Sequence, residues 1–65
     1  MTKKTLEKMP ENIQKYIEII KGAYQNQLID KDRIRDRANG YTMGLKHAGL
    51  ITDRERMALF SYITL

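Results

Sequence analysis

Apolar residues recur at helical spacing once the chain has passed Pro10. Gaps of three or four residues separate the apolar positions that follow, which are Ile13, Ile17, Ile20, Tyr24 and Leu28. Residues at this spacing fall on one stripe of a helix. Proline is favoured in a first turn because the N–H that it lacks would have no partner there. The pattern therefore predicts a helix over residues 10–26 that buries one face.

A second helical pattern follows Asp30, whose side chain is of the type that caps helix N-termini. Its apolar positions are again three or four residues apart, at Ile34, Ala38, Tyr41, Leu45 and Ala48. This spacing predicts a helix over residues 31–48. The pair Asn39 and Gly40 is also typical of a hairpin turn. A helix broken at this pair is therefore the alternative.

The strongest local signal is the start of a third helix. Thr52 and Glu55 are spaced as a capping box, in which each side chain accepts a hydrogen bond from the backbone N–H of the other residue. Gly49 is placed to end the preceding helix in the left-handed conformation. These signals predict a third helix over residues 53–64. The expected fold is a compact all-α three-helix domain that spans residues 1–65.

Residues 1–9 precede the first periodic stretch and are expected to be flexible or loosely packed. Their lysines are not followed by the run of about 7 to 15 apolar residues that marks a signal peptide. No segment approaches the roughly 18 apolar residues of a membrane span. The chain contains no cysteine, which is typical of small domains in the reducing interior of a cell. A cytoplasmic protein without a membrane partner is therefore expected.

The sequence offers little for catalysis or metal binding. A chain of 65 residues rarely walls off a pocket with its supporting shells. The lone serine, Ser61, and the lone histidine, His47, come without the other partners of a catalytic triad. Asp30, Asp32 and Asp36 lack the loop glycine and the final glutamate of a calcium-binding EF-hand. The prediction is a protein that is not an enzyme and uses no metal or cofactor.

The charge balance allows an anionic partner. Twelve Lys and Arg against eight Asp and Glu leave a net charge of +4, which makes nucleic acid one hypothesis. Arg33 and Arg37 project from one side of the predicted second helix because they are four residues apart. With Arg54 and Arg56 at the start of the third helix, they would contact phosphates in a small nucleic-acid-binding regulator. The interleaved aspartates equally fit a solvated, ion-paired surface, so this function is the alternative.

The leading prediction rests on an excess of apolar residues for so short a chain. The segment MALFSYITL is apolar on nearly every side, and a three-helix core cannot cover every residue outside the narrow stripes. Aromatic and methionine side chains are favoured anchors at protein interfaces. We therefore expect a protein partner, or a second copy in a homodimer, to contact Tyr16, Met43, Phe60 and Tyr62.

The segment GYTMGLKHAGLITDRERMALFSY, residues 40–62, resembles the C-terminal part of small helical proteins encoded by phages and conjugative elements of Firmicutes. The matched positions are Gly40, Tyr41, Gly44, Leu45, Ala48, Gly49, Ile51, Thr52, Glu55, Arg56, Leu59, Phe60 and Tyr62. Asn39 stands where that group usually has arginine. No activity is assigned to that group, so the resemblance implies a mobile-element context and nothing catalytic. We expect a non-catalytic accessory protein that acts as a protein–protein interaction module.

Overall fold

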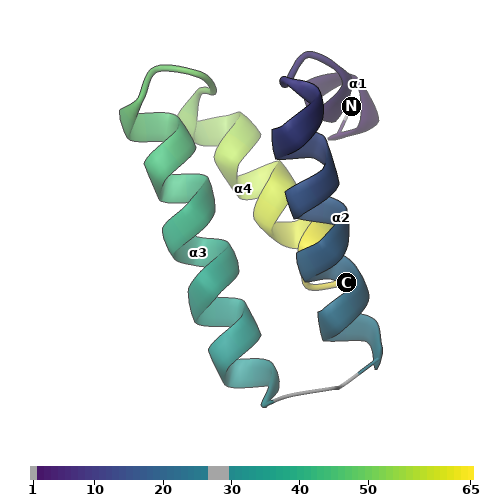
Figure 1. Ribbon diagram of the computed structural model, residues 1–65. Coiled ribbons are helices and arrows are strands. Elements are labelled where there is room, and N and C mark those ends of the chain that lie inside the picture. Colours follow the sequence, from purple (N-terminus) through teal and green to yellow (C-terminus); the bar gives the residue numbers. More distant parts are fainter. Residues whose placement is uncertain (1, 27–29) are drawn as a thin grey trace.

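The computed structural model describes residues 2–26 and 30–65, and these residues form four α-helices (Figure 1). The helices are α1 (Thr2–Glu7), α2 (Glu11–Asn26), α3 (Lys31–His47) and α4 (Asp53–Ile63). The all-α prediction is confirmed, and the three long helices begin and end within one residue of their predicted bounds. The expected count of three helices is wrong, because α1 was not predicted.

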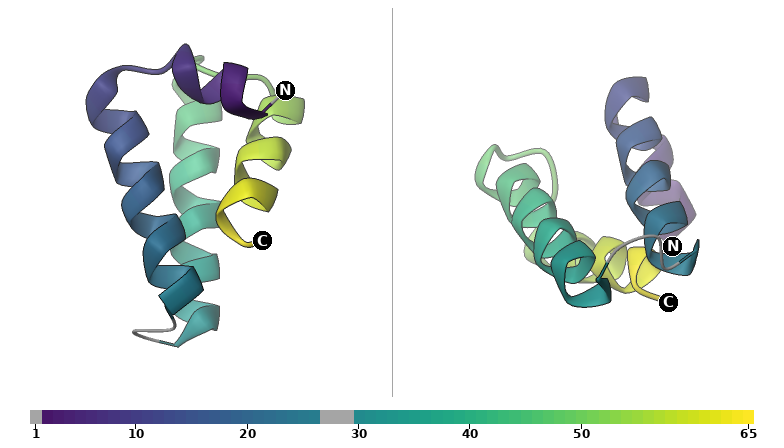
Figure 2. Two further views of the ribbon diagram at one scale, coloured as in Figure 1. Left: turned by 90° about the vertical axis from the view of Figure 1, so that its right-hand side faces the viewer. Right: turned by 60° about the horizontal axis from the view of Figure 1, so that its bottom comes forward.

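The three long helices surround a shared core, and α1 covers one end of it. α3 packs against both α2 and α4, and α2 also packs against α4. Seen from below the view of Figure 1, α2 and α3 form two arms with α4 between them (Figure 2). α1 lies across the end where α2 begins and packs against α4 (Figure 2). The unpredicted helix therefore closes the bundle at that end.

α3 runs without a break through Asn39 and Gly40, so the alternative of a broken helix is wrong. Burial on both sides of the pair outweighs its preference for a turn, because Ala38 and Thr42 are fully buried. The Thr42 hydroxyl donates to the carbonyl oxygen of Ala38 at 2.8 Å, so its burial leaves no unsatisfied donor. Helical periodicity thus decided the structure of this segment.

Both ends of α3 are capped by the residues that the sequence indicated. The Asp30 side chain accepts a hydrogen bond of 2.9 Å from the N–H of Asp32. At the other end Gly49 has a φ of 80°, the left-handed conformation that glycine adopts without strain. The chain then turns back, and the N–H of Leu50 donates to the carbonyl oxygen of Leu45 at 3.0 Å. This bond completes a Schellman motif and directs the chain toward α4.

Replacing Thr52 by alanine is expected to lower the free energy of unfolding by about 1 kcal/mol. The predicted capping box is present: the Thr52 hydroxyl oxygen accepts from the N–H of Glu55 at 3.1 Å, and the Glu55 carboxylate accepts from the N–H of Thr52 at 2.8 Å. Alanine removes the first of these bonds. Urea denaturation followed by circular dichroism measures the change, with Thr52→Ser as the control that keeps the hydroxyl. An equal loss in both variants would show that the hydroxyl does not stabilise the start of α4.

The N-terminal segment is packed against the bundle, so the expectation that residues 1–9 are loosely packed is wrong. Thr5, Leu6 and Met9 are buried. The side-chain amide of Gln14 donates to the carbonyl oxygen of Met9 at 2.7 Å, which ties the segment to α2. α1 escaped prediction because its six residues are too few to show a periodic apolar stripe.

The core contains side chains from all four helices. It also contains Met9, from the connection between α1 and α2, and Ile51, from the connection between α3 and α4. Leu28, the last position of the first predicted stripe, lies outside the described residues. The buried hydrophobic residues are Leu6, Met9, Ile17, Ile20, Tyr24, Ile34, Ala38, Leu45, Ile51, Leu59 and Ile63.

Candidate functional site

A groove of about 740 Å³ lies in the angle between α1 and the first half of α2. The end of α4 contributes one side chain to it, that of Tyr62. We refer to it as the α1–α2 groove. Its lining residues are Lys3, Leu6, Glu7, Glu11, Gln14, Lys15, Glu18, Ile19 and Tyr62.

The apolar part of the α1–α2 groove consists of Leu6, Ile19 and Tyr62. Leu6 is buried, whereas 66% of Ile19 is exposed. Apolar surface left in water is unfavourable, and an uncovered apolar group beside a groove is a common mark of a binding surface. The groove therefore offers a partner an apolar contact that the fold itself leaves open.

Three contacts hold Tyr62 at the edge of the groove. Its hydroxyl donates to the Glu18 carboxylate at 2.5 Å. The Lys21 ammonium lies 4.3 Å from the centre of its ring and donates to its backbone carbonyl oxygen at 2.8 Å. The hydrogen bond to Glu18, with a further contribution from burial, raises the pKa of the Tyr62 hydroxyl. A neutral ring held in this way loses little conformational entropy when a partner packs against it.

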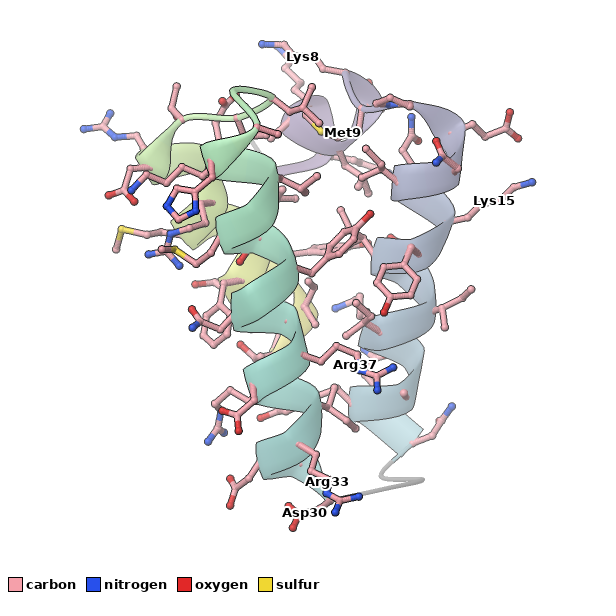
Figure 3. All side chains as sticks on the ribbon, turned by 60° about the vertical axis from the view of Figure 1, so that its left-hand side comes forward. Lys8, Met9, Lys15, Asp30, Arg33 and Arg37 are labelled. Carbon is pink, nitrogen blue, oxygen red and sulfur yellow. The ribbon has the colours of Figure 1, made fainter. Side chains whose placement is uncertain are left out.

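The rim of the groove is acidic, although the protein as a whole is basic. Three carboxylates against two ammonium groups give the lining a net charge of −1, whereas the whole chain carries +4. Lys15 forms an exposed ion pair of 3.4 Å with Glu11, which is worth little in water. Figure 3 shows the Lys15 side chain pointing away from the bundle. Glu7 has no ion pair within the described ranges, so the rim favours an approaching cation.

Of the four predicted partner-binding residues, only Tyr62 lines the groove. The ring of Tyr16 packs against Tyr41 with 4.6 Å between the ring centres, so it joins α2 to α3. Met43 and Phe60 are half-buried on α3 and α4. The structure therefore does not gather the four predicted anchors in the α1–α2 groove.

The large apolar residues that the structure leaves exposed are different ones, namely Ile19, Leu50, Met57 and Leu65. Sequence reasoning did not select Ile19 as an anchor, although a signal for it existed. Ile19 is two positions after Ile17, so the two side chains point about 200° apart on a helix. An isoleucine opposite the buried stripe is the feature that could have identified it.

The four predicted nucleic-acid-binding arginines are divided between the first half of α3 and the start of α4. Arg33 and Arg37 lie one turn apart on α3 and point to the same side, as predicted (Figure 3). Arg54 and Arg56 belong to the start of α4, which lies beside the C-terminal end of α3 (Figure 1). Because α3 has 17 residues, it is about 25 Å long. Arg33 therefore cannot share a phosphate with Arg54 or Arg56. Arg37 is only two residues from Asn39, which Arg56 contacts at 3.4 Å, but its side chain points to the opposite side of α3.

The Arg56 side chain makes contacts within the protein. Its side chain is 18% exposed and donates to the Asp53 carboxylate at 3.3 Å and to the side-chain oxygen of Asn39 at 3.4 Å. Lys46 also contacts Asp53, at 3.2 Å. These two cations, Lys46 first, lower the pKa of the Asp53 carboxyl group. Arg56 therefore joins α4 to α3 and is poorly placed to contact an external phosphate.

Comparison with protein-family models, with curated proteins and with solved structures found no match to this chain. In the part of the chain that the structure describes, none of the helices has the length and apolar character needed to cross a membrane. The same part contains no cluster of three or more His, Asp or Glu side chains that could hold a metal ion.

Proposed function

We propose that the protein is a non-catalytic, cytoplasmic protein-binding module whose α1–α2 groove receives an amphipathic helix of a partner protein. The observation that carries the proposal is the exposed side chain of Ile19, beside Leu6 and Tyr62 in an open groove. Amphipathic helices bind such grooves through apolar residues spaced along one face. The resemblance of residues 40–62 to proteins of phages and conjugative elements supports an accessory role in a mobile element.

The acidic rim indicates the chemistry of the partner. A helix that places apolar side chains on Ile19 and Tyr62 would carry Lys or Arg on its flanks, where Glu7 and Glu18 complement them. A second copy of this chain is a poorer occupant, because two chains of charge +4 repel each other. We therefore infer a different protein as the partner in place of a homodimer.

Photo-crosslinking from position 19 tests this proposal. The full chain with p-benzoylphenylalanine in place of Ile19 is produced in a bacterial host and irradiated, and the adducts are identified by mass spectrometry. The expected result is one defined adduct with another protein, through a basic amphipathic helix of that protein. The adduct should be absent when the same photoreactive residue replaces Asp36, which is exposed on α3. An adduct between two copies of the chain would contradict the proposed partner.

Ile19→Glu is expected to weaken the complex with that partner by at least about tenfold, as measured by titration calorimetry. The substitution removes an apolar contact and adds a further negative charge to the rim. Because Ile19 is largely exposed, the free energy of unfolding should stay within about 0.5 kcal/mol of the parent value.

Leu50→Glu is the matched control for this variant, because Leu50 is also exposed, at 48%, and lies outside the groove. It introduces the same side chain in place of another large apolar residue. Binding of the partner should be unchanged in this control. Equal weakening in both variants, or none in either, would exclude the α1–α2 groove as the binding site.

A further inference from the structure

A second cavity, of about 330 Å³, lies between α1 and the start of α4. We refer to it as the α1–α4 cavity. Three cationic side chains against one carboxylate give its lining a charge of +2, opposite in sign to that of the α1–α2 groove. The lining residues are Lys4, Thr5, Lys8, Arg54, Glu55 and Ala58.

None of the three cations of this cavity forms an ion pair within the described ranges. Lys4 and Lys8 are four residues apart at the N-terminal end of the chain, and Arg54 comes from the facing helix α4. The ion pairs of the described residues involve other cations, which are Lys15, Arg35, Lys46 and Arg56. The positive charge at the α1–α4 cavity is therefore left to interact with solvent or with a ligand.

The single carboxylate of the cavity is already bound. The Glu55 carboxylate accepts the N–H of Thr52 at 2.8 Å in the capping box. This hydrogen bond is the main reason why the pKa of Glu55 is lowered, and the charge of Lys8 lowers it further. Glu55 is therefore ionised and held at the start of α4, where it offsets one of the three positive charges and leaves two.

We propose that the α1–α4 cavity binds one phosphate ester group, with Lys4, Lys8 and Arg54 as its cationic ligands. The planar guanidinium of Arg54 can donate two parallel hydrogen bonds to phosphate oxygens, and the lysines add point charges. Ala58 and the aliphatic stems of the lysines supply an apolar wall for the carbon skeleton of the ester. The cavity volume is at the lower end of the range for small-ligand pockets, so it suits a phosphate with one attached group.

The distribution of positive charge favours a site for a single phosphate group over a continuous surface that contacts many phosphates of a nucleic-acid backbone. Arg33 and Arg37 have no ion pair in the part of the chain that the structure describes. Arg33 lies at the opposite end of the molecule from Lys8, and Arg37 lies near the middle of α3 (Figure 3). The same phosphate chemistry could come from a small phosphorylated molecule or from a nucleic-acid backbone. The experiment below separates these two sources.

Titration of the ¹⁵N-labelled full chain, followed by amide chemical shifts, tests the proposal. The probes are inorganic phosphate, adenosine monophosphate and a DNA duplex of about 20 base pairs, in about 50 mM salt. We expect saturable shifts at the amides of residues 4–8 and 54–58. Shifts with the monophosphate and none with the duplex identify a small ester as the source, and shifts of the same amides with the duplex identify the backbone. No saturable shift of these amides with any probe would overturn the proposal.

Paired charge variants decide whether the cavity itself binds the phosphate. Lys4→Gln combined with Lys8→Gln is expected to weaken binding by at least about tenfold. Arg33→Gln combined with Arg37→Gln removes the same charge outside the cavity, on α3, and is expected to leave the affinity unchanged. Equal weakening by the two pairs would show attraction by net charge alone and would overturn the proposal.

Glu55→Gln is expected to strengthen phosphate binding, whereas a variant that fails to fold would bind phosphate more weakly. Glutamine also serves at this position of a capping box, so the start of α4 is retained while the negative charge beside the ligand is removed. We expect the variant to bind phosphate several-fold more tightly. Weaker binding would contradict the placement of the phosphate beside Glu55. Ile19 lies in the separate α1–α2 groove, so Ile19→Glu should leave phosphate binding unchanged. Failure of one of the two proposals would therefore leave the other unaffected.

Discussion

Leu59→Ala is expected to remove about 2 to 5 kcal/mol from the free energy of unfolding. Leu59 is fully buried, and it belongs to α4, the helix that packs against each of the other three. Alanine loses the transfer free energy of the removed methyl groups and leaves a cavity among close-packed neighbours. A domain of 65 residues has a total stability of about 3 to 10 kcal/mol. The variant should therefore lose roughly half of that stability.

Urea denaturation followed by circular dichroism measures this effect as a lower midpoint at an unchanged slope. Met57→Ala is the matched control, because Met57 lies on the same helix and is 56% exposed. Its free energy of unfolding should change by less than about 0.5 kcal/mol. Similar losses in the two variants would mean that α4 does not bury the face that carries Leu59.

The long helices could be predicted because their signals are local. Thr52 and Glu55 cap α4 across three residues, and Gly49 ends α3 through its own backbone conformation. The apolar spacing that defines α2 and α3 extends over several turns, so single exceptions such as Gly40 did not change the outcome. Such signals depend on neighbours in the sequence and not on how the helices pack.

The candidate sites are formed by packing between segments that are far apart in the sequence. The spacing of apolar residues along the chain does not indicate which segments pack together. The α1–α2 groove exists because α1 lies across the end of the bundle, and Tyr62 reaches it from α4 (Figure 2). Tyr16 was a reasonable anchor from its residue type, but its ring is partly covered by Tyr41 from α3. Residue type therefore indicated which side chains suit an interface, and tertiary contacts decided which of them are available.

The division of the arginines could have been derived from the sequence. Arg33 and Arg54 both lie near the start of a helix, and a short connection joins the two helices. Helices joined in this way run in opposite directions, so their starts lie at opposite ends of the bundle. Grouping the arginines by residue type alone overlooked this geometry. Lys4 of α1 and Lys8, which follows α1, accompany Arg54 at the α1–α4 cavity, and both belong to the segment that was expected to be loosely packed.

Leu6→Ala is expected to lower the free energy of unfolding by about 2 kcal/mol, because the Leu6 side chain is buried against the core. A loosely packed segment 1–9 would give no change. Lys3→Ala is the control, since Lys3 is exposed on the same helix and its removal should cost less than about 0.5 kcal/mol. Urea denaturation compares the two variants.

The same variant should show a second effect that depends on where α1 lies. α1 carries residues of both the α1–α2 groove and the α1–α4 cavity, so partial undocking of α1 would disturb both. In Leu6→Ala, hydrogen exchange at the amides of α1 should become faster while exchange in the middle of α3 stays slow. Uniformly faster exchange across all helices would instead show that α1 and the bundle unfold as one unit. In either case α1 is the element on which both proposed binding sites depend.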